Sequence, residues 1–122
     1  QQGEEDEEPK KKKKKKPTEF IKFEPFTVNL QPEEDGERHY LQVEISLKVN
    51  QTEVVGIIKE KMPEIRNKAL LSLSSKKASE IFTLEGKQQL GKVIVEEVQL
   101  IVGDEDFNED IKETLFNSFI IQ

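Results

Sequence analysis

Two groups of residues in this sequence contain side-chain types that acid–base or nucleophilic catalysis uses. His39 is the only histidine, and it lies between Arg38 and Tyr40 in a polar stretch. A catalytic histidine needs a nucleophile or further ligands beside it, so we expect an exposed loop histidine. The segment 74–77 (SSKK) could hold a serine–lysine pair, but two adjacent lysines after the end of a predicted helix indicate solvent rather than a lysine that has lost its proton. We therefore predict that the protein is not an enzyme.

An acidic segment, residues 104–110, could instead bind a metal ion. Its first five residues, DEDFN, match the first three ligand positions of an EF-hand calcium loop. The match then fails, because Glu109 replaces the glycine of the sharp turn and Leu115 replaces the bidentate glutamate. Three oxygen ligands are too few for calcium, so we favour an acidic solvated loop without metal. Weak calcium binding by loop 104–110, as part of a periplasmic calcium- or ligand-binding module, is the alternative. No pattern indicates a cofactor.

The first 17 residues differ in composition from the rest of the 122-residue chain. They contain no apolar side chain, only an acidic block at residues 4–8 followed by seven lysines at residues 10–16. Such a segment cannot bury enough surface to offset its ordering entropy, so residues 1–17 are predicted to be a disordered charged linker. Residues 18–122 hold 12 basic and 20 acidic side chains, a balance of −8, and all the hydrophobic ones.

The lysine run has two interpretations. Seven lysines could hold the tail at an anionic lipid surface, at about 1 kcal/mol each, which would make the protein a lipid-binding scaffold. The neighbouring acidic block screens them over a Debye length of ~8 Å, so we favour an extended spacer. Nucleic acid is not an expected partner, because the domain is acidic and no aromatic side chain interrupts the lysines.

Three features are absent from the sequence, and each limits what the protein can be. It has no cysteine, which excludes disulfides, thiolate nucleophiles and cysteine-ligated zinc. No window approaches the ~18 consecutive apolar residues of a transmembrane helix. The chain begins with Gln1 and shows no signal peptide, so we expect a segment of a longer protein.

The hydrophobic periodicity predicts an α+β domain over residues 26–122, joined to the tail by residues 18–25. Residues 26–30 and 40–49 alternate apolar and polar side chains, which is typical of strands with one buried face, and together they form a predicted hairpin. Residues 111–122 are apolar on both sides, which predicts an inner strand.

The apolar spacing changes to three and four after Asn50, which predicts helices. We expect them over residues 52–61 and 63–74, the first capped by Asn50 or Thr52, and from the cap residue Thr83 to Gly103, with a turn and a short helical piece before the last. The predicted order is β-β-α-α-α-β, a small sheet with helices packed on one face.

Five segments carry a resemblance to a known family: 38–47 (RHYLQVEISL), 62–66 (MPEIR), 71–76 (LSLSSK), 83–87 (TLEGK) and 115–122 (LFNSFIIQ). In this order they are similar to the periplasmic domain of the FliL family, bacterial flagellar basal-body-associated proteins. The resemblance covers roughly residues 26–122.

This resemblance implies a single-pass inner-membrane protein whose transmembrane helix is absent from this chain. Residues 1–17 would lie just outside the membrane, and the domain would lie on the periplasmic side at the flagellar basal body. The resemblance also implies a fold like that of stomatin/prohibitin (SPFH) domains, self-association as a ring, and contacts with flagellar stator subunits and basal-body components that support torque, motility and chemotaxis. The family contributes no catalytic motif.

Two surfaces are expected to contact partners. One is formed by the aromatic residues next to the linker, and the other by the solvent-facing side of the long strand. The residues are Phe20, Phe23 and Phe26, and Tyr40, Gln42 and Glu44. For Phe26, packing within its own domain is an equal alternative, because it lies on the apolar stripe of its strand.

Overall fold

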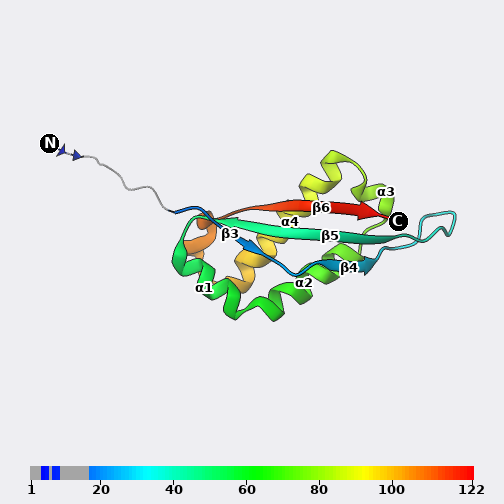
Figure 1. Cartoon of the computed structure of the whole chain (residues 1–122), viewed down its shortest axis with the longest axis horizontal. Helices are drawn as coiled ribbons and strands as arrows, with labels where there is room; N and C mark the ends of the chain where they lie inside the picture. Colours follow the sequence, from blue (N-terminus) through cyan, green and yellow to red (C-terminus); the bar gives the residue numbers. More distant parts are fainter. Residues whose placement is uncertain (1–3, 6, 9–16) are drawn as a thin grey trace.

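The computed structural model describes residues 4–5, 7–8 and 17–122 (Figure 1). Two short strands in the acidic block, β1 (Glu4–Glu5) and β2 (Glu7–Glu8), pair with each other in a separate two-stranded sheet. Most of the predicted linker lies outside the described residues, so its disorder stays a prediction. The other elements form a four-stranded antiparallel sheet with helices packed on one face, which confirms the predicted α+β class.

The central strand of the sheet is β5 (Tyr40–Val49), which pairs antiparallel with strands on both sides. On one side lie β3 (Glu19–Lys22) and β4 (Phe26–Asn29), and on the other lies β6 (Ile111–Ile121). The predicted hairpin of β4 and β5 is confirmed. The prediction that the last strand is an inner strand is wrong, because β6 pairs with β5 alone among the described strands and forms an edge.

Strand β3 lies in the segment 18–25, which we expected only to join the tail to the domain. The alternation along β3 turns Ile21 toward the helices and Phe20 away from them. The backbone N–H of Phe23 then donates to the carbonyl of Ile45 at 2.9 Å. Pro25 separates β3 from β4, because proline has no N–H to give to a ladder. The core of the domain therefore begins before residue 26.

Four α-helices connect β5 to the C-terminal part of the chain: α1 (Thr52–Glu60), α2 (Met62–Ser74), α3 (Ala78–Ile81) and α4 (Leu84–Val102). Both predicted caps of the last helix are confirmed. Thr83 Oγ1 accepts a hydrogen bond from the N–H of Gly86 at 3.0 Å, and Gly103 ends the helix with a φ of 74°. Among the described residues, no helix has the length and apolar character needed to cross a membrane.

The predicted cap of the first helix is wrong. Gln51 is the N-cap residue of α1 and makes no side-chain capping bond. Thr52 Oγ1 donates instead to Glu19 Oε2 at 2.9 Å. Pairing of β3 with β5 brings Glu19 beside the start of α1, a contact between distant segments that local sequence patterns do not contain.

Residues 104–110 fold more tightly than the solvated loop that we expected. They contain a 3₁₀ helix, η1 (Glu105–Asp110), and Asp104 Oδ1 caps it by accepting from the N–H of Asp106 at 3.0 Å. Asp110 is buried, and its carbonyl accepts from the backbone N–H of Asn50 at 3.0 Å. The expectation of a fully solvated loop is wrong at this end, because Asp110 ties the end of β5 to the start of β6.

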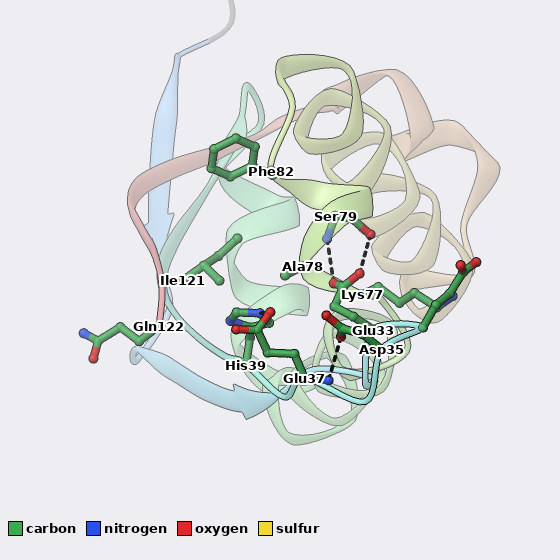
Figure 2. Close-up of a pocket in the computed structure, with 11 residues that line it drawn as sticks. Glu33, Asp35, Glu37, His39, Lys77, Ala78, Ser79, Phe82, Ile121 and Gln122 are labelled. Atoms are coloured by element: carbon green, nitrogen blue, oxygen red, sulfur yellow. Dashed lines mark hydrogen bonds and ion pairs between the residues drawn. The ribbon is translucent and has the colours of Figure 1, made fainter.

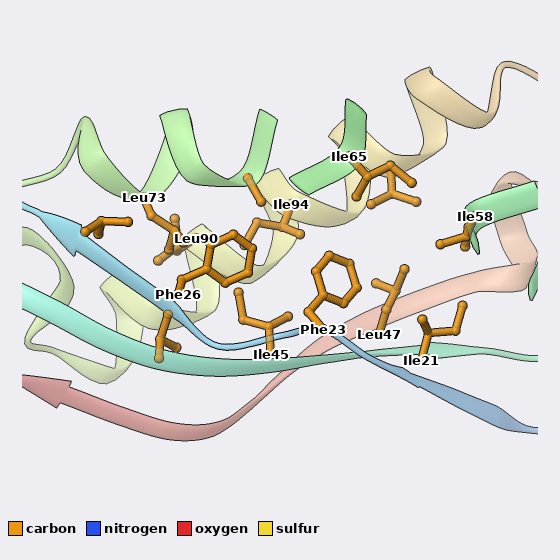
Figure 3. Close-up of a cluster of buried hydrophobic side chains, with 14 of the residues drawn as sticks. Ile21, Phe23, Phe26, Ile45, Leu47, Ile58, Ile65, Leu73, Leu90 and Ile94 are labelled. Carbon is orange, nitrogen blue, oxygen red and sulfur yellow. The ribbon is translucent and has the colours of Figure 1, made fainter. Parts of the chain in front are cut away.

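The core lies between the sheet and the helices (Figure 3). At its centre Phe23 and Phe26 pack with ring centroids 6.2 Å apart. Arg66 on α2 donates to the carbonyls of Glu24 and Pro25 at 2.6 and 2.7 Å, and its guanidinium lies 4.0 Å from the centre of the Phe26 ring. The bend between β3 and β4 is thereby fixed to α2.

Candidate functional site on the open face of the sheet

The helices cover one face of the four-stranded sheet (Figures 1 and 3). No described helix covers the other face, here called the open sheet face. Leu41 and Val43 of β5 point into the core, so the residues between them point outward. The pairing register decides which residues of the neighbouring strands stand beside them. The open sheet face consists of Phe20, Lys22, Thr27, Asn29, Tyr40, Gln42, Glu44, Ser46, Lys48, Glu113, Leu115, Ser118 and Ile120.

Three large hydrophobic side chains on this face are exposed to solvent. Phe20 is 59% exposed, Ile120 46% and Tyr40 37%. Polar residues stand beside them, with Phe20 opposite Lys48 and Ile120 opposite Gln42. Aromatic side chains are enriched at protein interfaces relative to the rest of a protein surface, so Phe20 and Tyr40 make this face a candidate for contact with another protein.

Contacts between β5 and β6 hold this face in place. The backbones of Tyr40 and Gln122 exchange two hydrogen bonds, of 2.8 and 2.9 Å, and Tyr40 Oη donates to Gln122 Oε1 at 3.0 Å. Further along, Lys48 Nζ lies 3.7 Å from Glu113 Oε2. A surface formed on a paired sheet loses little conformational freedom when it binds.

Four of the six residues predicted to contact partners lie on the open sheet face: Phe20, Tyr40, Gln42 and Glu44. Phe20 stands beside Lys48, at the opposite end of β5 from Tyr40. The other two, Phe23 and Phe26, are each 2% exposed and pack under the helices (Figure 3). Their side chains cannot touch a partner in this conformation. For Phe26, packing within its own domain was the equal alternative, because it lies on the apolar stripe of its strand.

Sequence reasoning missed the contribution of β6, which adds Leu115 and Ile120 to the open sheet face. Matching the alternation of apolar and polar side chains in β6 to that in β5 could have identified these two residues. Two register shifts, which leave Lys112 and Asn117 unpaired, break that alternation. Because β6 is also apolar on both sides, its sequence alone does not say which residues face outward.

A hollow of about 910 Å³ lies between the loop after β4 and α3 (Figure 2). His39 lines it, with its Nε2 3.5 Å from Glu37 Oε1. We predicted an exposed loop histidine, whereas His39 is half-buried. Within the described residues, no group of three or more histidine, cysteine, aspartate or glutamate side chains lies close enough together to hold a metal ion.

Glu33 in the same hollow fixes the loop to α3. Its Oε2 accepts from the backbone N–H of Ser79 at 3.0 Å, and its Oε1 accepts from Ser79 Oγ at 2.9 Å (Figure 2). These two bonds, the backbone one first, hold the pKa of Glu33 below its ordinary value, because donors stabilise the ionised carboxylate. The backbone of Gln31 also donates to the carbonyl of Lys76 at 2.8 Å. These contacts give Glu33 a structural role.

The serines of the SSKK segment bond back to their own helix. Ser74 Oγ donates to the carbonyl of Leu71 at 3.2 Å, and Ser75 Oγ donates to that of Ser72 at 2.8 Å. Such bonds are ordinary for hydroxyls near a helix end. They direct both hydroxyl protons to carbonyls of α2 and away from a lysine base.

Comparison with known proteins gives two matches. Residues 20–122 match the family described as "Flagellar basal body-associated protein FliL". The curated "Flagellar protein FliL" of Aquifex aeolicus (strain VF5) is 31% identical over 98 residues, which are 80% of this chain. The match spans 57% of the length of that relative. The family match includes all of the four-stranded sheet except Glu19, together with all of its helices, and the chain belongs to the FliL family.

Proposed function

We propose that this domain is a non-enzymatic accessory part of the flagellar motor. It self-associates, as a ring, and contacts stator units through the open sheet face, which supports torque generation and motility. A transmembrane helix outside this chain holds it on the periplasmic side of the inner membrane at the basal body. An SPFH-like arrangement of the fold belongs to the same proposal. The family membership supports the flagellar setting.

The observation that carries the proposal is the open sheet face itself. An antiparallel sheet can keep one face in water, but that face is then normally polar. Here Phe20, Tyr40 and Ile120 expose ring and aliphatic surface on it, between side chains of both charges. Aromatic residues held on a rigid strand lose little entropy on binding and contribute strongly to protein interfaces. The face therefore suits a protein partner better than a small substrate.

The tail fits this role as a spacer. A flexible segment of 17 residues has an r.m.s. reach of roughly 20–25 Å, and more if like charges extend it. Such a reach would let the domain stand away from the membrane surface and meet the part of a stator unit that projects there. Anchoring would also raise the local concentration of copies.

The test is crosslinking of the full-length protein in cells, followed by mass spectrometry of the trapped partners, with Phe20→Ala as the main variant. We expect crosslinks to stator subunits and to other copies, and at least about a fivefold loss of stator recovery in Phe20→Ala, the loss expected from about 1 kcal/mol of contact energy. Phe82→Ala is the matched control, because Phe82 is 74% exposed but lies between α3 and α4, outside the sheet.

Three outcomes separate the parts of the proposal. An equal loss of stator recovery in Phe20→Ala and Phe82→Ala would mean that the open sheet face is not the contact surface, and that any loss of exposed apolar surface has the same effect. Crosslinks between copies without any to stator subunits would remove the stator contact. Absence of both kinds of crosslink would overturn the accessory role as proposed.

A further inference from the structure

The two edges of the sheet are not equally protected. The edge formed by β3 and β4 consists of two four-residue strands separated by Pro25, and Arg66 occupies the carbonyls of Glu24 and Pro25. Short strands, proline and charge are the usual protection of an edge. The other edge, β6, is eleven residues long and contains no proline, and between its two register shifts residues 113–116 continue without interruption. Among the described strands it pairs only with β5. The backbone of β6 is thus the open edge of this sheet.

A groove of about 820 Å³ runs along this edge, between β6 and α4. Five consecutive residues of β6, 112–116, line it together with residues of α4. Consecutive side chains of a strand point to opposite faces, so five in a row can line one groove only if it follows the strand backbone. The groove therefore leaves room beside the edge, where another strand would lie.

The backbone groups that face the groove follow from the register. Tyr40 exchanges hydrogen bonds with Gln122, and the N–H of Asn50 bonds to Asp110, so the even-numbered residues of β5 bond to β6. Ser46 is paired with Leu115 and Lys48 with Glu113. In an antiparallel pair, bonded positions alternate with positions whose groups point away. The N–H and C=O of Thr114 and Phe116 are thus directed to the free edge.

The charge of the groove distinguishes it from the rest of the domain. Residues 18–122 carry 12 basic and 20 acidic side chains, a balance of −8, so most of the surface repels a second copy. The groove is lined by three lysines and two glutamates, Lys87, Lys92, Lys112, Glu96 and Glu113. Because the groove carries both charges, lysines of one copy can lie beside glutamates of another. Apolar side chains, among them Leu84, Val95 and Phe116, also line the groove.

We propose that β6 pairs antiparallel with β6 of a second copy, so that two four-stranded sheets become one continuous sheet about a two-fold axis. Leu115 lies at the axis and faces its own counterpart, and Thr114 exchanges hydrogen bonds with Phe116 of the second copy. This register is preferred over one centred on Thr114, which would set the two Glu113 side chains diagonally beside each other, since like charges at such positions are destabilising.

This interface rests on the self-association in the proposed function and defines one of its contacts. A two-fold contact closes at two copies, so a ring would join such pairs through a second, different contact. A two-fold axis of an antiparallel pair is perpendicular to the sheet, so the open sheet faces of both copies lie on the same side. The partner surface that carries Phe20 and Tyr40 is thereby doubled, and neither residue is covered.

The first test removes one edge donor. Thr114→Pro deletes the N–H that faces the groove and leaves the β5 ladder intact, while Thr114→Val keeps the N–H and the β-branched shape but loses the hydroxyl that donates to the Gly91 carbonyl at 3.0 Å. We expect Thr114→Pro to weaken self-association by about tenfold, since two hydrogen bonds are lost per dimer. Thr114→Val should associate like wild type in sedimentation measurements.

The second test does not depend on the proline variant folding. Leu115→Cys, introduced into the full-length protein, should form an oxidant-induced disulfide between copies in cells, because facing residues of paired strands lie within disulfide range. Thr27→Cys, on the same face but beside the protected edge, should not, and residues 1–122 supply no cysteine of their own. If copies associate but neither Leu115→Cys nor Thr114→Pro behaves as stated, the β6 interface is overturned and self-association stands. If a general crosslinker traps no copies at all, both are overturned.

Discussion

Phe20 and Phe23 lie three residues apart in the sequence and play opposite parts in the structure. Phe20 stands on the open sheet face, and Phe23 packs on Phe26 beneath the helices. We expect Phe23→Ala to lower the free energy of unfolding by about 3–5 kcal/mol, through lost burial and a cavity, and Phe20→Ala to change it by less than about 0.5 kcal/mol. Urea unfolding of both variants measures the difference. Equal effects would contradict the described register of β3.

Glu33 should make part of the stability depend on pH. Its bonds from Ser79 hold its pKa below the ordinary value of 4.5. A carboxyl whose pKa is lower in the folded state stabilises that state above the unfolded pKa, and this contribution is lost as the pH falls through the folded value. Stability should therefore fall below about pH 4.5, and less steeply in Glu33→Gln.

The pKa of Glu33 can be followed directly. Ser79→Ala removes the hydroxyl donor and keeps the backbone donor, so we expect the pKa of Glu33 to rise part of the way toward its ordinary value. An NMR titration of the Glu33 carboxyl carbon measures the change. An unchanged pKa would mean that the hydroxyl does not bond to the carboxylate in solution.

At the scale of elements, two glycines inside helices test how closely α3 and α4 approach each other. A Cβ added to Gly86 would lie 1.9 Å from the backbone carbonyl oxygen of Glu80, whereas one added to Gly56 in α1 meets nothing within 4 Å. Gly86→Ala should destabilise the domain by about 1–3 kcal/mol or more, since backbone must shift. Gly56→Ala should stabilise it by up to about 1 kcal/mol, the difference in helix propensity. Thermal unfolding of Gly86→Ala and Gly56→Ala measures both changes in stability. If Gly86→Ala is as stable as wild type, the close packing of α3 against α4 is contradicted.

The two long elements that face each other, α4 and β6, differ in how far their sequences fix them. Helix α4 has a threonine cap, a glycine end and an apolar face, and each of these acts within a few residues. The sequence of β6 predicts a strand but not its pairing. Its two register shifts depend on β5, and it is an edge because it pairs with no other described strand.

For the whole molecule, the spacer role of the tail predicts that length matters more than lysine. Replacing residues 10–16 by seven glycine and serine residues keeps a similar reach, so we expect motility and stator crosslinking to stay within about twofold of wild type. Deleting the same residues should reduce both. Loss of salt-sensitive binding to anionic vesicles, together with loss of motility in the replacement variant, would favour the lipid-binding interpretation.

Local sequence patterns were enough to predict the α+β class, the hairpin of β4 and β5, the caps of α4 and the polar side of β5 that holds Tyr40, Gln42 and Glu44. These depend on periodicity and capping, which act between near neighbours. Three features became known from the folded domain: β3 joins the sheet, β6 is an edge among the described strands, and Phe20 and Ile120 share a face with Tyr40 while Phe23 does not. The physical reason is that a shift of one residue in strand pairing moves every side chain to the other face, and pairing is chosen by contacts between segments far apart in the chain.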